Sequence, residues 1–252
     1  MRTSALTLML YFSAFAQTFE VASIKPSDPN ANGAMMRYLP GGGIEMKGFS
    51  LKAMIVNAWR VQPFQITGGP KWLSDARFDI MAKAERPVKP ADALIRLRGL
   101  LQDRFQLVVR QETREMPVYE LVLARKDGKL GPKMIESQCP VYDVDHPPPP
   151  QPSEAQKGCG GSSGGPHMER AKGSQMAGLV AALASKLERT VIDKTGLKGK
   201  FDMTLDWSAD QGADGGPTIF TALEEQLGLK LVSSKGPVEM LVVERAEKPT
   251  GN

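Results

Sequence analysis

The sequence predicts an α+β protein of two tandem related lobes, each with antiparallel strands and two helices, joined by a long Pro/Gly-rich linker. Three observations support this prediction: an apolar run at the N-terminus, a Gly/Pro/Ser-rich stretch in the middle, and short motifs that recur in the same order on either side of it. The predicted organisation is a signal peptide at 1–16, a first lobe at 17–125, a flexible linker at 126–172, a second lobe at 173–246 and a tail at 247–252.

The first sixteen residues have the layout of a secretory signal peptide. Met1-Arg2 supplies a positive start, residues 5–16 are apolar, and Ala14-Phe15-Ala16 is an A-x-A cleavage signal. This run is well short of the roughly 20 residues that a membrane-spanning helix needs. We therefore expect an exported chain, periplasmic or extracellular, that begins near Gln17 and has no stable membrane insertion after cleavage.

The overall composition is that of an ordinary globular protein, with 41% hydrophobic and 24% charged residues. The 32 basic residues exceed the 28 acidic ones by only four, which is too small an excess to predict a nucleic-acid partner. Two His and two Cys in the whole chain leave little material for metal or imidazole chemistry. We predict no cofactor and no metal.

The linker contains both cysteines of the chain, Cys139 and Cys159. From residue 137 to 166, 16 of 30 residues are Gly, Pro or Ser, a composition that buries too little apolar surface to offset its ordering entropy. In an exported chain the expected state of such a pair is a disulfide. The alternative is a metal site that adds His146 and His167, although its C-x6-H-x12-C-x7-H spacing matches none of the usual zinc patterns.

Four short motifs recur on the two sides of the linker and indicate a duplicated unit. The apolar helical stripe that begins at Leu51 recurs at Met176, and Arg77-Phe78-Asp79-Ile80 recurs as Lys200-Phe201-Asp202-Met203. A second stripe recurs further on, and residues 117–125 match 237–245 at five of nine positions. Offsets between the copies vary by only five residues.

Each unit reads as helix, two strands, helix, two strands. The helices are predicted to begin at Leu51 and near Pro90 in the first unit, and at Met176 and near Pro217 in the second, because a helix tolerates proline in its first turn. Strands are predicted near residues 19–25, 44–47, 61–67, 77–84, 105–111 and 118–125, and near 190–193, 200–207, 229–233 and 238–244. Residues 118–123 and 241–243 are almost entirely apolar, which predicts central strands.

Three patterns resemble catalytic or metal-binding motifs, but each lacks its partners. Residues 160–164 fit G-x-S-x-G, yet they lie in the linker rather than between a buried strand and a helix. Lys194-Thr195-Gly196 copies a penicillin-binding motif without the S-x-x-K or S-D-N that completes it, so we interpret it as a turn. Acids recur at every fourth position (Asp202, Asp206, Asp210 and Asp214), a spacing unlike that of a Ca²⁺ loop. We predict no catalytic residue.

A recognition surface is predicted at the Gly68-Gly69-Pro70 turn. An aromatic side chain that follows such a turn can stay partly exposed and contact a ligand, which makes Gly69, Pro70, Lys71 and Trp72 the candidate binding residues. Packing of Trp72 into the core is the alternative. The groove between the lobes is a second place where a small ligand could bind.

Several of these segments together resemble an uncharacterised family of exported proteins from soil bacteria. The resemblance rests on the mature start Phe19-Glu20-Val21-Ala22-Ser23-Ile24-Lys25-Pro26 and on the stretches GGPKWL (68–73), DKTGLKG (193–199) and QLGLKL (226–231). It covers the mature chain apart from the linker. The family domain also resembles the extracytoplasmic part of some membrane peptidases related to beta-lactam sensors, but this chain has no H-E-x-x-H, so a peptidase role is not implied.

The sequence therefore favours a non-enzymatic exported module that binds an envelope protein, a peptide or a small ligand. A sensor-type extracytoplasmic domain that acts with a membrane peptidase is one alternative. A hydrolase is another, and it would need a nucleophile, a base and an orienting acid in one cleft.

Overall fold

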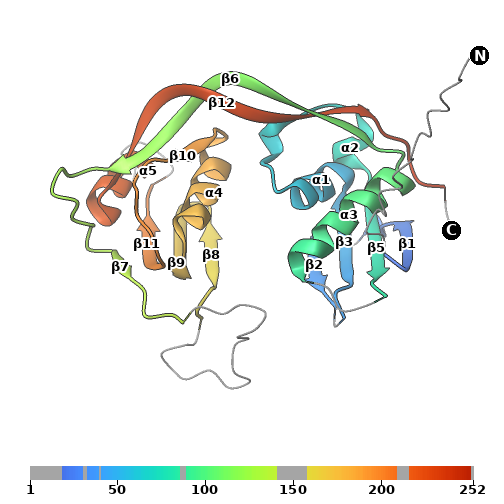
Figure 1. The fold of residues 1–252 in the computed structure, drawn as a ribbon, viewed down its shortest axis with the longest axis horizontal. Coiled ribbons are helices and arrows are strands. Elements are labelled where there is room, and N and C mark those ends of the chain that lie inside the picture. Colours follow the sequence, from blue (N-terminus) through green and yellow to red (C-terminus); the bar gives the residue numbers. More distant parts are fainter. Residues whose placement is uncertain are drawn as a thin grey trace, which may run out of the picture. The chain divides into compact units, whose positions relative to one another are not determined.

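The fold is α+β, as the sequence predicts. In the computed structural model, residues 19–30, 33–39, 41–85, 89–140, 158–208 and 216–250 are described, except for the side chains of residues 90 and 91. Their strands form three four-stranded sheets, with the orders β1-β5-β3-β2, β10-β6-β12-β4 and β7-β11-β9-β8 (Figure 1). Among the described residues, no helix combines the length and apolar character that crossing a bilayer requires.

The helices and strands have these bounds. The strands are β1 (Val21–Pro26), β2 (Met35–Tyr38), β3 (Ile44–Ser50), β4 (Ile66–Gly68), β5 (Arg77–Lys83), β6 (Val108–Leu123), β7 (Met134–Glu136), β8 (Ser162–Gly165), β9 (Met168–Ser174), β10 (Val191–Asp193), β11 (Phe201–Asp206) and β12 (Leu229–Arg245). The helices are α1 (Leu51–Trp59), the 3₁₀ turn η1 (Pro63–Gln65), α2 (Trp72–Asp75), α3 (Pro90–Arg104), α4 (Met176–Leu187), α5 (Ile219–Ala222) and the π-helical segment η3 (Leu223–Leu227).

The chain divides into two compact units whose boundaries differ from those of the predicted lobes. The first unit is formed from residues 1–60, 69–109 and 243–252, and the second from 61–68 and 110–242. The second unit therefore contains the short strand β4 and most of β6, which belong to the first half of the sequence.

The sheet β10-β6-β12-β4 combines strands from both halves of the sequence. β6 and β12 are its two central strands, as their apolar runs predict, and β10 and β4 form its edges. β10 pairs with β6 in parallel, with Val191 opposite Tyr119. The prediction of two short strands in place of β6, and again in place of β12, was wrong. In both β6 and β12 the strand continues through the polar residues between the two predicted short strands, because cross-strand pairing satisfies the backbone N–H and C=O groups of these residues.

The first unit packs α1, α2 and α3 with the sheet β1-β5-β3-β2. Helix α1 begins at the N-cap Ser50, whose Oγ accepts the N–H of Ala53 at 3.2 Å, and it ends at Arg60 in the left-handed region at φ 56°. Its apolar face is buried together with the inner row of the sheet. Arg98 of α3 donates from Nε to the carbonyl of Ala58 at 2.7 Å, which joins α3 to the end of α1. α3 begins at Pro90, as predicted.

The second unit repeats this arrangement with the sheet β7-β11-β9-β8. Helix α4 lies against β9 and β10, and η3 lies against β11. Their apolar side chains form one core that includes Leu179, Phe201 and Leu223. The last helix of the unit was predicted to begin near Pro217, but α5 begins at Ile219. Thr218 is the N-cap and its Oγ accepts the N–H of Thr221 at 3.2 Å, so a hydroxyl rather than the proline starts the helix.

Strand pairing shows that the repeat extends into the segment predicted as a linker. β7, β8 and most of β9 lie within residues 126–172, and the three strands take the same places in their sheet as β1, β2 and β3 take in the first unit. Both sheets also shift register at the same point, between Met46 and Phe49 in β3 and between Phe201 and Met203 on the β11–β9 ladder. The polar, Gly-rich β8 is a strand because it pairs with β9 along its whole length.

Candidate functional site

The four predicted binding residues lie in a single turn of the first unit. Gly69 has φ 78°, and a Cβ built on it would lie 3.0 Å from Cγ1 of Val243, so this position requires glycine. The carbonyl of Pro70 accepts the N–H of Leu73 at 3.0 Å, and the side chain of Lys71 is exposed. The turn therefore presents Lys71 to solvent.

Trp72 is half-buried and has packing partners in the same unit. Its ring is 6.3 Å from that of Phe78 in a T-shaped contact, and Nζ of Lys248 lies 6.0 Å from its centroid. These contacts attach the C-terminal segment and α2 to the edge of the first unit's core. The role of Trp72 in ligand binding remains a prediction.

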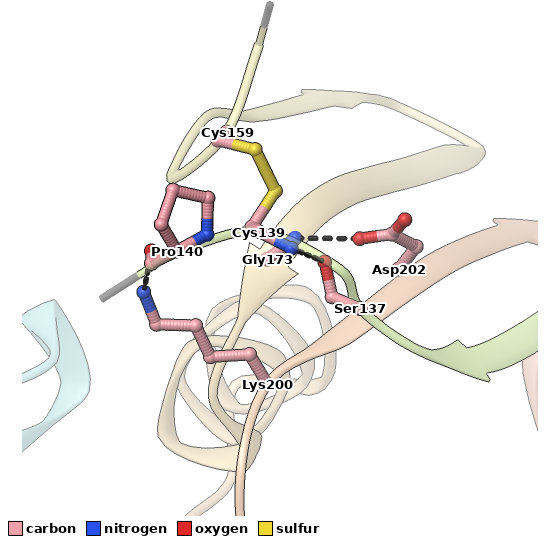
Figure 2. Close-up of a disulfide and its surroundings, with 7 residues drawn as sticks. All are labelled: Ser137, Cys139, Pro140, Cys159, Gly173, Lys200 and Asp202. Atoms are coloured by element: carbon pink, nitrogen blue, oxygen red, sulfur yellow. Dashed lines mark hydrogen bonds between the residues drawn. A yellow bond between two sulfur atoms is a disulfide. The ribbon is translucent and has the colours of Figure 1, made fainter. Parts of the chain in front are cut away.

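The two cysteines form the disulfide that the sequence predicts. The Cα atoms of Cys139 and Cys159 are 5.6 Å apart, and Figure 2 shows the bridge beside the bulge at Gly173. The bond consumes both sulfurs, so they are not available as thiolate ligands. Of the histidines in the alternative metal set, His146 lies outside the described residues and His167 is exposed, with its ring 6.3 Å from that of Trp207.

The G-x-S-x-G stretch does not form a nucleophile elbow. Residues 162–165 are the strand β8, which continues through a turn into β9 rather than into a helix. Lys194-Thr195-Gly196 is a turn, as predicted: Oδ1 of Asp193 accepts from the N–H of Thr195 at 2.9 Å and from its hydroxyl at 2.7 Å.

Of the acids at every fourth position, the two in the described ranges, Asp202 and Asp206, have different partners. Asp202 accepts the N–H of Gly173, whereas Asp206 forms an ion pair with Lys133 at 3.0 Å on the outer face of the sheet. Asp210 and Asp214 lie outside the described residues. Within the described ranges, no group of three or more His, Cys, Asp and Glu residues is placed to hold a metal ion.

A cavity of about 240 Å³ lies in the second unit between the inner face of its sheet and helix α4. Buried apolar side chains from the sheet, the helix and η3 form its walls, namely Leu179, Met203, Leu205 and Leu227. Glu169, Ala171 and Ser174 of β9 add one row of lining, with Ser162 of β8 and Gly178 of α4 at the exposed side. The cavity is therefore an apolar pocket with one carboxylate and two hydroxyls.

Strand register identifies the residues that occupy the same positions in the first unit. In β3, Ile44 pairs with Ala82 and Met46 with Ile80. In β9, Glu169 pairs with Leu205 and Ala171 with Met203, the equivalent positions on β11. By the same rule Phe49 corresponds to Ser174, because they pair with Phe78 and Phe201.

The comparison extends to the neighbouring strand and shows how the pocket arises. Met36 and Tyr38 of β2 pair with Met46 and Ile44, whereas Ser162 and Gly164 of β8 pair with Ala171 and Glu169. The first unit thus has large side chains at these positions, and Ile44 and Met46 are fully buried. In the second unit smaller or polar residues stand at every one of these positions. The same scaffold thus buries Ile44 and Met46 in the first unit, whereas the corresponding residues of the second unit line a cavity.

Glu169 is the charged group of the pocket. Its carboxylate lies over Gly164, since a Cβ on that glycine would be 2.5 Å from Oε2. Burial raises the pKa of Glu169, and the charge of Lys186 opposes that effect. The Lys186 ammonium itself donates to the carbonyl of Gly165 at 2.6 Å. Among the described residues, no side chain lies within hydrogen-bond or ion-pair distance of this carboxylate.

Sequence reasoning did not find this pocket, although a signal for it exists. The repeat was traced from the helices at 51 and 176 onward, with an offset of 125 residues. Continuing that offset toward the N-terminus aligns Ile44, Met46 and Phe49 with Glu169, Ala171 and Ser174. The low strand propensity of the Gly/Ser-rich stretch hides the equivalence.

The fold is thus a duplicated α+β arrangement with a cavity in its second unit. The chain belongs to the family described as "Protein of unknown function (DUF3738)", whose model matches residues 52–246. This confirms the predicted resemblance to an uncharacterised family; the opening motif at residues 19–26 lies outside the matched range. No curated protein and no solved structure matches the chain.

Proposed function

We propose that this chain is an exported, non-enzymatic module that binds a small ligand in the pocket between β8, β9 and α4. The observation that carries the proposal is the difference between the two repeats. A protein interior is close-packed by default, and an unfilled space loses the contacts that its lining would otherwise make. The first unit shows that this scaffold accommodates a filled inner face, so the hollow is a feature of the second unit's residues and not of the fold.

The groups in the pocket suit binding better than hydrolysis. A hydrolase needs a nucleophile with a base in hydrogen-bond reach and a group that orients the base. The hydroxyl of Ser174 donates to the carbonyl of Gln175 at 3.2 Å instead of to a base. One carboxylate and two hydroxyls among apolar walls resemble the few polar groups that fix the orientation of a ligand in an apolar site.

Export is supported by the disulfide and by the N-terminal layout. Disulfides persist in oxidising compartments, and the Cys139–Cys159 bridge is formed. If the signal peptide is cleaved as proposed, the N-terminus of the protein recovered from a bacterial envelope fraction will be Gln17. A chain that retains Met1 in the cytosol would contradict this part of the proposal.

The binding role can be tested by filling the pocket with the residue of the first unit. Ala171→Met restores the side chain that Met46 provides in the equivalent position. Ligand-observed NMR with benzene-sized probes should show binding to the wild type and its loss in this variant, while the melting temperature stays the same or rises.

The matched control is Arg170→Met, which places the same side chain one residue earlier in β9, on the opposite face of the sheet. This control should bind the probes as the wild type does. Equal binding to the Ala171→Met variant, or no binding of any probe to the wild type, would reject the proposed pocket.

A further inference from the structure

The space that a cavity requires does not explain why Glu169 is in the pocket. The second unit has small residues at the positions equivalent to Met46, Phe49 and Met36, and these residues line the cavity. The Ile44 position, however, becomes Glu169, a side chain that is no smaller and carries a charge. Placing a carboxylate among apolar walls is unfavourable unless a partner compensates it.

Among the described residues, the Glu169 carboxylate has no such partner. The charge of Lys186 acts on it, but this ammonium donates to the carbonyl of Gly165. The inner-face hydroxyls of the pocket are those of Ser162 and Ser174, and the Ser174 hydroxyl is used by a backbone carbonyl. The carboxylate thus lies over Gly164, and Glu169 lines the cavity.

The walls restrict the rest of the ligand to a small apolar group. Leu179, Leu205 and Leu227 are each less than 4% exposed and present only hydrocarbon. A cavity of about 150 Å³ with similar walls accommodates a benzene molecule. At about 240 Å³, this pocket has room for one ring or a six-carbon chain together with a short polar arm.

We propose that the pocket binds a small primary amine with an aromatic or aliphatic body, whose ammonium group pairs with the carboxylate of Glu169. This inference rests on the proposed binding function and names its ligand class. The apolar body replaces the side chains that Met46 and Phe49 provide in the first unit. The ammonium supplies a charge-assisted hydrogen bond that none of the described residues makes with the Glu169 carboxylate.

Three probes of nearly equal shape test this assignment: benzylamine, benzyl alcohol and benzoate. Their dissociation constants are measured by calorimetry or NMR titration at neutral pH with the mature, disulfide-bonded chain. We expect benzylamine to bind at least about tenfold more tightly than benzyl alcohol, as suits a hydrogen bond between two charged partners. Benzoate should be the weakest ligand because its carboxylate is repelled by Glu169.

Glu169→Gln removes the charge of the pocket and keeps a side chain of nearly the same shape. This variant should bind benzyl alcohol as well as the wild type does, with the preference for benzylamine reduced to about onefold. Glu225→Gln removes an equal charge from an exposed position and is the matched control; it should keep the full preference. A thermal melt verifies that both variants are folded.

The outcomes distinguish the ligand class from the binding role. If benzyl alcohol binds as tightly as benzylamine, or if Glu169→Gln keeps the amine preference, the assignment of an amine is wrong while the pocket remains a binding site. If none of the three probes binds to the wild type, both the amine assignment and the proposed function fail.

Discussion

Oδ1 of Asp202 accepts a hydrogen bond from the backbone N–H of Gly173 at 2.7 Å. Asp79 holds Gly48 in the same way at 3.0 Å in the first unit. Gly48 and Gly173 have φ values of 71° and 69° and lie where the two sheets shift register. In each repeat, one aspartate therefore stabilises a glycine bulge just before the first helix.

The bulge at Gly173 should not tolerate a side chain. A Cβ built on it would lie 2.7 Å from Cβ of Cys139 and 2.9 Å from its sulfur, in addition to the strain of a positive φ. Gly196→Ala is the matched control, because its φ of 72° is similar and nothing lies within 4 Å of the added atom. We expect Gly196→Ala to cost about 1 kcal/mol of unfolding free energy and Gly173→Ala at least twice as much. Equal losses in urea denaturation would show that the disulfide does not crowd this position.

Loss of the disulfide should destabilise the second unit. The bridge closes a loop of 20 residues, and its removal restores about 3 kcal/mol of unfolded-state entropy to the chain. The double variant Cys139→Ser/Cys159→Ser should therefore unfold at a lower urea concentration than the wild type. Wild-type protein in a thiol reductant should unfold at the same urea concentration as the double variant. A midpoint that does not move in either case would contradict the prediction.

Asp79 should make the first unit sensitive to acid. Burial alone would raise the pKa of Asp79, but the hydroxyl of Ser27, the N–H of Gly48 and two nearby lysines outweigh it and hold the pKa below its ordinary value. The ionised form is thus favoured in the folded chain. Its stabilising contribution is complete above about pH 4, the ordinary aspartate pKa, and is lost as the pH falls through the lowered value.

A comparison of Asp79→Asn with the wild type measures this contribution. We expect the variant to be less stable by about 1 kcal/mol at pH 7, with the difference shrinking as the pH falls below 4. The control is Asp103→Asn, which makes the same substitution at an exposed aspartate. A difference that is constant from pH 7 to pH 2 would show that the charge of Asp79 has no role.

The contribution of Glu169 to stability should depend on pH in the opposite sense to that of Asp79, because burial raises the pKa of Glu169. The folded chain then disfavours the charged form, so ionisation of Glu169 lowers stability as the pH rises through the ordinary glutamate range. Without ligand, Glu169→Gln should raise the melting temperature at pH 7 and leave it unchanged at pH 3. A variant that melts earlier at pH 7 would indicate a stabilising partner for the carboxylate.

Trp72 should contribute to the packing of the first unit whether or not it contacts a ligand. Trp72→Ala removes the contacts with Phe78 and Lys248 and should cost about 2 kcal/mol, since the residue is only half-buried. Trp72→Phe keeps the aromatic contact and should cost less than half of that. Ligand affinity that is unchanged in Trp72→Ala would remove the hypothesis that residues 69–72 form a binding surface.

Much of the fold could be predicted from local patterns. The helix at Leu51 follows from its apolar spacing and from Ser50, and the central place of β6 follows from its apolar run. β8 could not be predicted, because Ser-Ser-Gly-Gly has no strand propensity and becomes a strand only by pairing with β9. The single long β12 was missed because a proline and a glycine at its centre resemble a turn.

The sequence by itself determined the α+β class, the duplication, the pairing of Cys139 with Cys159 and the family resemblance. These depend on periodicity and on residue identity, which are local or can be compared directly along the chain. Only the tertiary structure decided that strands of both halves share one sheet and that Glu169 stands where the first unit has Ile44. Register between strands is a long-range property, and a cavity exists only when the side chains around it have been placed.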